Sequence, residues 1–208
     1  MRTAALLLLA GAGALLAGCI PALIGAGAAG AYTALEDRRT AGTQIDDESI
    51  EVRSANRIAD RFGDRVHVNV TSFNRTALIT GEVPDEAARE EIEKIVRAVP
   101  TVRGVTNDLQ VAGASSLGAR TNDSYLTSKV KARLLDSSRV SPLHIKVVTE
   151  AGVVYLLGVV TEAEADEAVE LARTTGGVRK VVKVFEYCKP DDNVCRTREA
   201  PPPARQRS

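Results

Sequence analysis

Aromatic residues are scarce in this chain of 208 residues, which has no tryptophan, three phenylalanines and four tyrosines. A folded core therefore has to be built mainly from valine, isoleucine, leucine and alanine. An excess of one charge is also lacking, because 27 basic residues balance 27 acidic ones. A net charge of zero gives no long-range field that would attract nucleic acid, so no nucleic-acid partner is predicted.

Histidine is nearly absent as well, which limits the chemistry available. His67 and His144 are the only two, and each alternates with aliphatic residues in a predicted strand. We therefore expect both side chains to face solvent. Neither is accompanied by a Ser-His-Asp order or by a His/Cys cluster with metal-site spacing. The sequence predicts no catalytic residue, no metal site and no cofactor, and thus a protein that is not an enzyme.

The chain begins with a hydrophobic leader. Arg2 precedes an uncharged aliphatic run over residues 4–17, and this run ends in Leu16-Ala17-Gly18-Cys19. A charged head, an apolar centre and small residues before a cleavage point are typical of a signal peptide. The last four residues resemble the lipobox of bacterial lipoproteins. That resemblance implies removal of residues 1–18 and acylation of Cys19 as the lipid anchor.

An alternative is a single transmembrane helix, since residues 3–35 carry no charge and are numerous enough to span a bilayer. Pro21 and the nearby glycines weaken a helix there, so we favour a lipid anchor followed by a tether over residues 19–45. Ile20 follows the anchor. By resemblance to lipoprotein sorting in enteric bacteria, a residue other than Asp there implies the outer membrane, with the folded part facing the periplasm.

After the tether, residues 46–111 show alternating helix and strand patterns. We expect a helix that opens at Asp46-Asp47-Glu48, two strands, a second helix with an apolar face, and a third strand over Val102–Val111. A linker rich in Gly, Ser and Ala covers residues 112–120. The order helix, strand, strand, helix, strand predicts a small domain with one sheet.

The same pattern returns in residues 121–187, where Asn122-Asp123-Ser124 are expected to cap the first helix. Gly158-Val159-Val160-Thr161 lies 77 residues after Gly81-Glu82-Val83-Pro84, and His144 lies 77 residues after His67. We therefore interpret the folded part as an internal duplication.

Each copy resembles the BON domain, and the segments Gly42–Asp47, Glu51–Arg53 and Asn122–Val130 resemble segments of that family in place. The resemblance implies an α+β fold of two tandem αββαβ domains, each a three-stranded mixed sheet with two helices on one face. Two such domains behind a lipobox resemble the dual BON-domain outer-membrane lipoproteins. Membership would imply a role in envelope integrity and cell division.

The two first helices differ in charge. Residues 46–65 contain six acids and four arginines, a net charge of −2. Residues 122–139 contain two acids and four bases, a net charge of +2. Tyr125, Lys129 and Arg133 are spaced by four and share one stripe, and an aromatic on a basic face suits an anionic lipid surface.

The family resemblance implies the same partner, because there the first helix of the second domain contacts anionic phospholipid, phosphatidylglycerol in particular. The expected lipid-binding residues are Tyr125, Ser128, Lys129, Lys131, Ala132, Arg133 and Leu135. Two alternatives stay open. Tyr125 could pack on the neighbouring domain with the bases as solvated charges, or the basic helix could dock on the acidic helix or another envelope protein, which would make the protein an interaction scaffold.

Residues 188–208 form a tail outside the resemblance. Cys188 and Cys195 are an even pair in an oxidising compartment, so we expect a disulfide that pins the tail to the last strand. The final residues are basic and proline-rich and are expected to be disordered.

Overall fold

The computed structural model describes residues 37–195. The predicted signal peptide, the Cys19 anchor and the tether up to residue 36 lie outside the described residues, as does the basic tail from 196 to 208. Across residues 37–195, no helix is both long and apolar enough to cross a membrane.

The first repeat, called domain 1, runs from residue 41 to residue 111. Its helices are α3 (Ala41–Phe62) and α4 (Glu86–Arg97), and a short 3-10 turn (Gly63–Arg65) follows α3. Its strands are β1 (His67–Phe73), β2 (Thr76–Val83), β3 (Gly104–Asn107) and β4 (Gln110–Val111).

The second repeat, called domain 2, repeats this order between residues 117 and 187. Its helices are α5 (Leu117–Leu135) and α6 (Glu162–Arg173), with a 3-10 turn (Pro142–His144) after α5. Its strands are β5 (Ile145–Glu150), β6 (Val153–Val160) and β7 (Lys180–Tyr187).

Both sheets have the mixed topology expected from the αββαβ order. β1 and β2 pair antiparallel through the tight turn at Asn74-Arg75, and β3 then pairs parallel with β2. In the same way β5 pairs antiparallel with β6, and β7 pairs parallel with β6 over its whole length. The predicted α+β fold with two three-stranded mixed sheets is confirmed, with β4 as a short additional pairing on β2.

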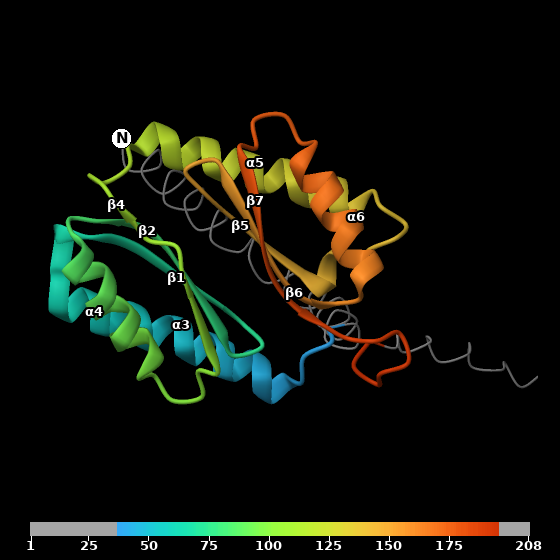
Figure 1. Cartoon of the computed structure of the whole chain (residues 1–208), viewed down its shortest axis with the longest axis horizontal. Coiled ribbons are helices and arrows are strands. Elements are labelled where there is room, and N and C mark those ends of the chain that lie inside the picture. The colour runs from blue at the N-terminus through green and yellow to red at the C-terminus, as the bar shows by residue number, and fades with distance from the viewer. Residues whose placement is uncertain (1–36, 196–208) are drawn as a thin grey trace, which may run out of the picture. The chain divides into compact units, whose positions relative to one another are not determined.

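One face of each sheet is covered by the two helices of its own domain (Figure 1). In domain 1, Ile50 and Ile58 of α3 and Ile92 of α4 share one buried cluster with Ala77 and Ile79 of β2. The matching cluster in domain 2 includes Val130, Leu134, Ala168, Val154 and Leu156. Aliphatic side chains make up nearly all of both cores, as the scarcity of aromatic residues requires.

The other faces of the two sheets contact each other. Side chains on that face form one buried cluster drawn from both domains: Phe73, Leu78, Tyr155, Leu157 and Val159. Polar contacts also join the domains. The Tyr155 hydroxyl donates to Asp108 at 2.7 Å, and Lys146 Nζ lies 2.6 Å from Glu51 Oε1. The two domains therefore share a core, a point that the sequence left open.

Both first helices begin earlier than predicted. α3 begins at Ala41 behind Thr40, whose hydroxyl accepts from the Thr43 N–H, and α5 begins at Leu117 behind Ser116, whose hydroxyl accepts from the Ala119 N–H. These hydroxyl caps satisfy N–H groups of the first turn, so the helices extend into stretches that we had assigned to linkers.

The acidic residues expected to open these helices lie inside them and have another role. Asp47 is buried and accepts from the N–H groups of Asn74 and Arg75, and Asp123 is buried and accepts from those of Ala151 and Gly152. Each aspartate thus fastens its helix to the turn of the following β-hairpin. The two positions are equivalent, 76 residues apart.

The third strand of domain 1 is not continuous over Val102–Val111 as predicted. It breaks between β3 and β4 at Asp108 and Leu109. Leu109 is buried in the core, while Asp108 accepts the hydroxyl of Tyr155 from domain 2. The break therefore accompanies contacts with the core and with domain 2, which the alternation of residues along this strand does not reveal.

At the other end of domain 2, Cys188 and Cys195 form a disulfide whose Cα atoms are 6.0 Å apart. Cys195 is buried, and its carbonyl accepts from Arg38. The segment after β7 is therefore held against the start of the described chain.

Candidate membrane-facing site

Helix α5 carries the predicted site, and its buried side decides which residues face outward. Asp123, Leu126, Val130 and Leu134 are its buried residues, and they recur at helical spacing toward the sheet. Residues on the opposite side of the helix are therefore presented to solvent.

That outward side holds three large exposed apolar residues. Leu117 is 79% exposed, Tyr125 62% and Leu135 67%, and the smaller Ser128 and Ala132 between them are also exposed. At 100° per residue these five side chains fall on one stripe. We call this stripe the α5 outer face. Leu117 was missed from the sequence because its segment was assigned to a linker.

The basic residues of α5 lie on the flanks of this face and are not equivalent. Lys129 Nζ donates to the carbonyl of Gly176 at 2.6 Å and lies 5.4 Å from the centroid of the Tyr125 ring. Arg133 donates to the Leu171 carbonyl at 2.6 Å and to the hydroxyls of Thr174 and Thr175. Arg133 therefore ties α5 to the end of α6.

Lys131 is exposed on the other flank, and no hydrogen bond or ion pair to it is found within residues 37–195. Among the three predicted bases of α5, it has the ammonium that is most available to an external ligand. The structure thus brings Tyr125, Ser128, Ala132 and Leu135 onto one surface, with Lys131 on one side of it and Lys129 on the other.

A cavity of about 360 Å³ lies at the end of α5. It is lined by Arg133, Asp136, Ser137, Ser138, Arg139, Glu167 and Leu171. Arg139 forms an ion pair with Glu167, and Asp136 adds a second carboxylate. Because the positive charges are balanced there, this cavity is a poorer place for a phosphate than the flank at Lys131.

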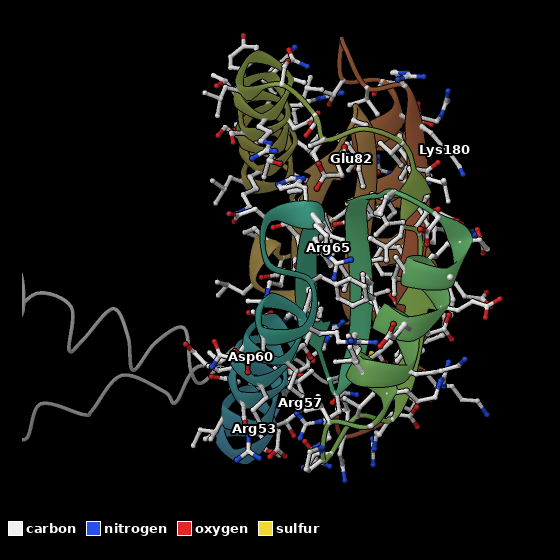
Figure 2. The ribbon with its side chains drawn as sticks, turned by 90° about the vertical axis from the view of Figure 1, so that its left-hand side faces the viewer. Arg53, Arg57, Asp60, Arg65, Glu82 and Lys180 are labelled. Atoms are coloured by element: carbon white, nitrogen blue, oxygen red, sulfur yellow. A yellow bond between two sulfur atoms is a disulfide. The ribbon has the colours of Figure 1, made fainter. Side chains whose placement is uncertain are left out.

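The equivalent helix of domain 1 presents a different surface. Arg53, Arg57 and Asp60 lie along α3, and Arg65 lies in the 3-10 turn that follows it (Figure 2). The position equivalent to Tyr125 is Ser49, and the one equivalent to Leu135 is Ala59.

The prediction that both histidines face solvent is wrong for His144, and His67 is only partly exposed. His144 is buried, and its Nδ1 lies 3.4 Å from Glu164. Glu164 also binds the guanidinium of Arg38 and caps α6 through Thr161. Burial alone would raise the pKa of the Glu164 carboxyl, but the hydrogen bonds from His144, Arg38 and Thr161 hold that pKa well below its usual range.

His67 lies on the sheet face that meets the other domain, with its Nδ1 3.0 Å from Glu82 Oε2. Glu150 approaches the same place from domain 2 and accepts from the Asn69 amide at 3.0 Å. Burial raises the pKa of the Glu150 carboxyl, and the nearby Glu82 and Asp123 act in the same direction against the Asn69 hydrogen bond. Alternation along β1 was predicted correctly, but its polar face is partly covered by the second sheet, and Asn69 stays exposed.

The fold is that of two tandem αββαβ units that share a core, with an apolar face exposed on the first helix of the second unit. The BON domain model matches residues 46–113 and 122–189, and the chain belongs to the BON domain family.

Relatives extend this assignment. The chain is 38% identical over 184 residues to "Outer membrane lipoprotein DolP" of Haemophilus influenzae, covering 88% of this chain and 95% of that protein. It is 34% identical over 160 residues to a "21 kDa hemolysin" of Actinobacillus pleuropneumoniae, covering 76% and 82%. "Osmotically-inducible protein Y" of Escherichia coli is 31% identical over 144 residues, covering 67% and 72%. The chain is accordingly a dual BON-domain outer-membrane lipoprotein with an envelope role, and its family points to a non-enzymatic protein.

Proposed function

We propose that the α5 outer face binds anionic phospholipid of the phosphatidylglycerol type and holds domain 2 against the membrane that carries the Cys19 anchor. The observation that carries this proposal is the exposure of Leu117, Tyr125 and Leu135 on one stripe opposite the core. Large apolar residues gathered on one exposed surface indicate an interaction site. In this arrangement the folded part faces the periplasm and supports envelope integrity.

The apolar residues supply the insertion energy. A leucine side chain moved fully out of water contributes about 1.5–3 kcal/mol, and partial insertion at the headgroup level contributes less. A tyrosine suits that level because its ring is apolar and its hydroxyl stays hydrated. An amphipathic helix that lies in the interface plane needs an apolar side of this kind.

The flanking charge supplies the preference for anionic lipid. A basic residue near an anionic surface contributes about 1 kcal/mol. Lys131 is fully available for this role, and Lys129 keeps further N–H donors beyond the one used on Gly176. Arg133 contributes mainly by positioning α5, because its guanidinium already donates to three groups at the end of α6.

The test is co-sedimentation of residues 32–208, without the acyl anchor, with neutral vesicles and with vesicles that contain phosphatidylglycerol. We expect the wild type to sediment with the anionic vesicles only. Tyr125→Glu and Lys131→Glu should each weaken that binding, because they place negative charge at the lipid surface. Lys129→Glu combined with Arg133→Glu is less informative, because it also removes the hydrogen bonds that tie α5 to α6 and to the segment after α6.

The matched control is Ser49→Glu, which makes the same kind of change at the equivalent, partly exposed position of α3. It should leave vesicle binding unchanged. If the wild type ignores anionic vesicles, the proposal fails and the anchor alone holds the protein at the membrane. Salt-sensitive binding to an envelope protein would then support the scaffold alternative. The docking of α5 on α3 is not part of that alternative, because the hydrogen bonds and ion pairs found between the described parts of the two domains involve none of Lys129, Lys131 and Arg133.

A further inference from the structure

Three potential metal ligands meet where the two sheets face each other. They are His67 on β1, Glu82 on β2 and Glu150 at the end of β5, and one ligand atom from each lies within 4.8 Å of the other two. Glu82 is only 7% exposed and Glu150 only 8%. Figure 2 labels Glu82, whose Oε2 also accepts from the backbone N–H of Ser115 in the linker at 3.2 Å.

The carboxylates of Glu82 and Glu150 have few positively charged partners. Within residues 37–195, Glu82 has an ion pair only with His67, and no lysine or arginine forms one with Glu150. Burial of two carboxylates side by side is costly unless a cation compensates them. Asp123 lines the same region, but both of its oxygens accept from the backbone of the β5–β6 turn.

We infer that His67, Glu82 and Glu150 form a site for one divalent first-row transition-metal ion, with zinc as the reference ion. An imidazole nitrogen with two carboxylate oxygens is a ligand set that zinc accepts, whereas calcium requires six to eight oxygen ligands. Small rotations of the glutamates bring three atoms within 4.8 Å to the roughly 2 Å ligand distances of such an ion. The inference is independent of lipid binding by α5.

The surroundings leave room for the ion to enter. A cavity of about 410 Å³ reaches His67 and Glu150 and is lined further by Asn69, Arg120, Asp123 and Thr127 among others. With three protein ligands, a fourth position is left for water from this cavity. Because His67 and Glu82 belong to domain 1 and Glu150 to domain 2, a bound ion would link the two domains.

Arg120 is the competing cation on the cavity wall. Its Nε donates to the Ser115 hydroxyl at 3.1 Å, which directs it toward the linker. If Arg120 instead neutralises the glutamates in solution, zinc will find no site.

The test uses the full chain purified in detergent micelles, stripped with a chelator and kept under non-reducing conditions so that Cys188 and Cys195 stay in their disulfide. Titration calorimetry with zinc chloride should show one ion bound per chain. The thermal unfolding midpoint should rise as zinc is added, because the ion binds the folded state. Glu150→Gln and His67→Gln should each lower zinc affinity by at least about tenfold.

Glu150→Gln is the sharper variant, because a glutamine oxygen still accepts from Asn69 and no ion pair to Glu150 is found within residues 37–195. Glu90→Gln, on the exposed side of α4, is the matched control and should keep wild-type affinity. Equal zinc binding by Glu150→Gln and wild type, or no binding by the wild type, overturns the inference. Cobalt titration of the wild type gives a second measurement: an absorption band of a low-coordinate ion supports the site, and the spectrum of hydrated cobalt rejects it.

Discussion

Helices α3 and α5 hold the same place in two copies of one domain, yet only their inward sides agree. Asp47, Ile50 and Ile58 of α3 are buried like Asp123, Leu126 and Leu134 of α5, each pair 76 residues apart. The outward sides differ in charge and in shape. The inward side is constrained by the sheet that it covers, whereas the outward side is free to acquire a separate function.

Apolar exposure alone does not separate the two helices. Ile45 and Val52 of α3 are exposed, as are Leu117 and Leu135 of α5. What differs is the aromatic residue and the charge around it, because residues 46–65 carry a net −2 and residues 122–139 a net +2. Attraction to an anionic surface therefore favours α5, and repulsion works against α3.

The largest predicted effect on stability concerns an ion pair that is found in domain 2 and has no equivalent in domain 1. Arg38 binds Glu164 of α6 at 2.8 Å, and both side chains are largely buried, whereas α4 has Ala88 at the position of Glu164. Glu164→Gln leaves the Arg38 guanidinium buried without its counter-ion, so we expect the free energy of unfolding to fall by about 3–5 kcal/mol. Urea unfolding followed by circular dichroism measures this, with the exposed Glu162→Gln as control.

The same pair predicts an acid dependence with a defined sign. The pKa of Glu164 is lower in the folded state than its ordinary value of 4.5, so the folded state binds fewer protons. Its contribution to stability is present above about pH 4.5 and is lost as the pH falls. The difference in the free energy of unfolding between wild type and Glu164→Gln should therefore become smaller in acid. A difference that does not change with pH would contradict this assignment.

A second comparison uses the two helix aspartates. Asp47 accepts from Ser72, Asn74 and Arg75 and pairs with Arg39, whereas Asp123 accepts only from two N–H groups within the described chain. We expect Asp47→Ala to cost about 3 kcal/mol and Asp123→Ala about 2 kcal/mol, because hydrogen bonds to charged groups and orphaned donors each contribute 1–3 kcal/mol.

Chemical denaturation of both variants gives the two values, and the asparagine variants at the same positions should lose less because one acceptor oxygen stays. A larger loss of stability in the Asp123 variants than in the Asp47 variants would contradict the prediction. It would show that the number of donors to each aspartate does not determine how much the contact stabilises the fold.

Much of the fold was predictable because it rests on local periodicity. The αββαβ order, the duplication and the apolar faces of the helices follow from spacing along the chain. The starts of α3 and α5 could not be predicted in this way. The hydroxyls of Thr40 and Ser116 cap the helices by accepting backbone N–H groups, and the residue types alone do not reveal these contacts. The break at Asp108 could not be predicted either, because Asp108 contacts Tyr155 in the other domain.

The candidate sites divide in the same way. Tyr125, Ser128 and Leu135 could be found because they lie within three turns of one helix. The His67, Glu82 and Glu150 cluster could not, since its ligands come from three strands and two domains. Alternation identified which face of β1 is polar, but a covered polar face and a solvated one give the same sequence pattern.

A further prediction exchanges residues between the outward sides of α3 and α5. In α5, Ser124→Glu, Tyr125→Ser and Lys131→Ala install the residues of the equivalent α3 positions, Glu48, Ser49 and Ala55. Binding to anionic vesicles should fall about tenfold or more, equal to about 1.4 kcal/mol, because an aromatic anchor and a cation are lost and an acid is gained.

The reverse exchange in α3 is the counterpart, measured in the same co-sedimentation assay. Glu48→Ser, Ser49→Tyr and Ala55→Lys should restore part of the binding when added to the altered α5. If the exchange in α5 leaves binding intact, the lipid contact lies elsewhere in the chain.

The smallest predicted effect concerns Ser54 and Val130, which are equivalent and both buried but differ in polarity. Ser54 of α3 is buried, and its hydroxyl has no hydrogen-bond partner among the described residues, whereas the equivalent Val130 of α5 packs in the core of domain 2. Ser54→Val removes an unsatisfied hydroxyl and adds apolar contacts, so we expect a gain of about 1 kcal/mol in the free energy of unfolding. Val130→Ser should cost more than this, because it leaves a cavity in a packed core and buries a hydroxyl. Urea unfolding of both variants would show whether the sheet constrains the two inward sides equally, and a loss of stability in Ser54→Val would mean that domain 1 is packed too tightly to accept the larger side chain.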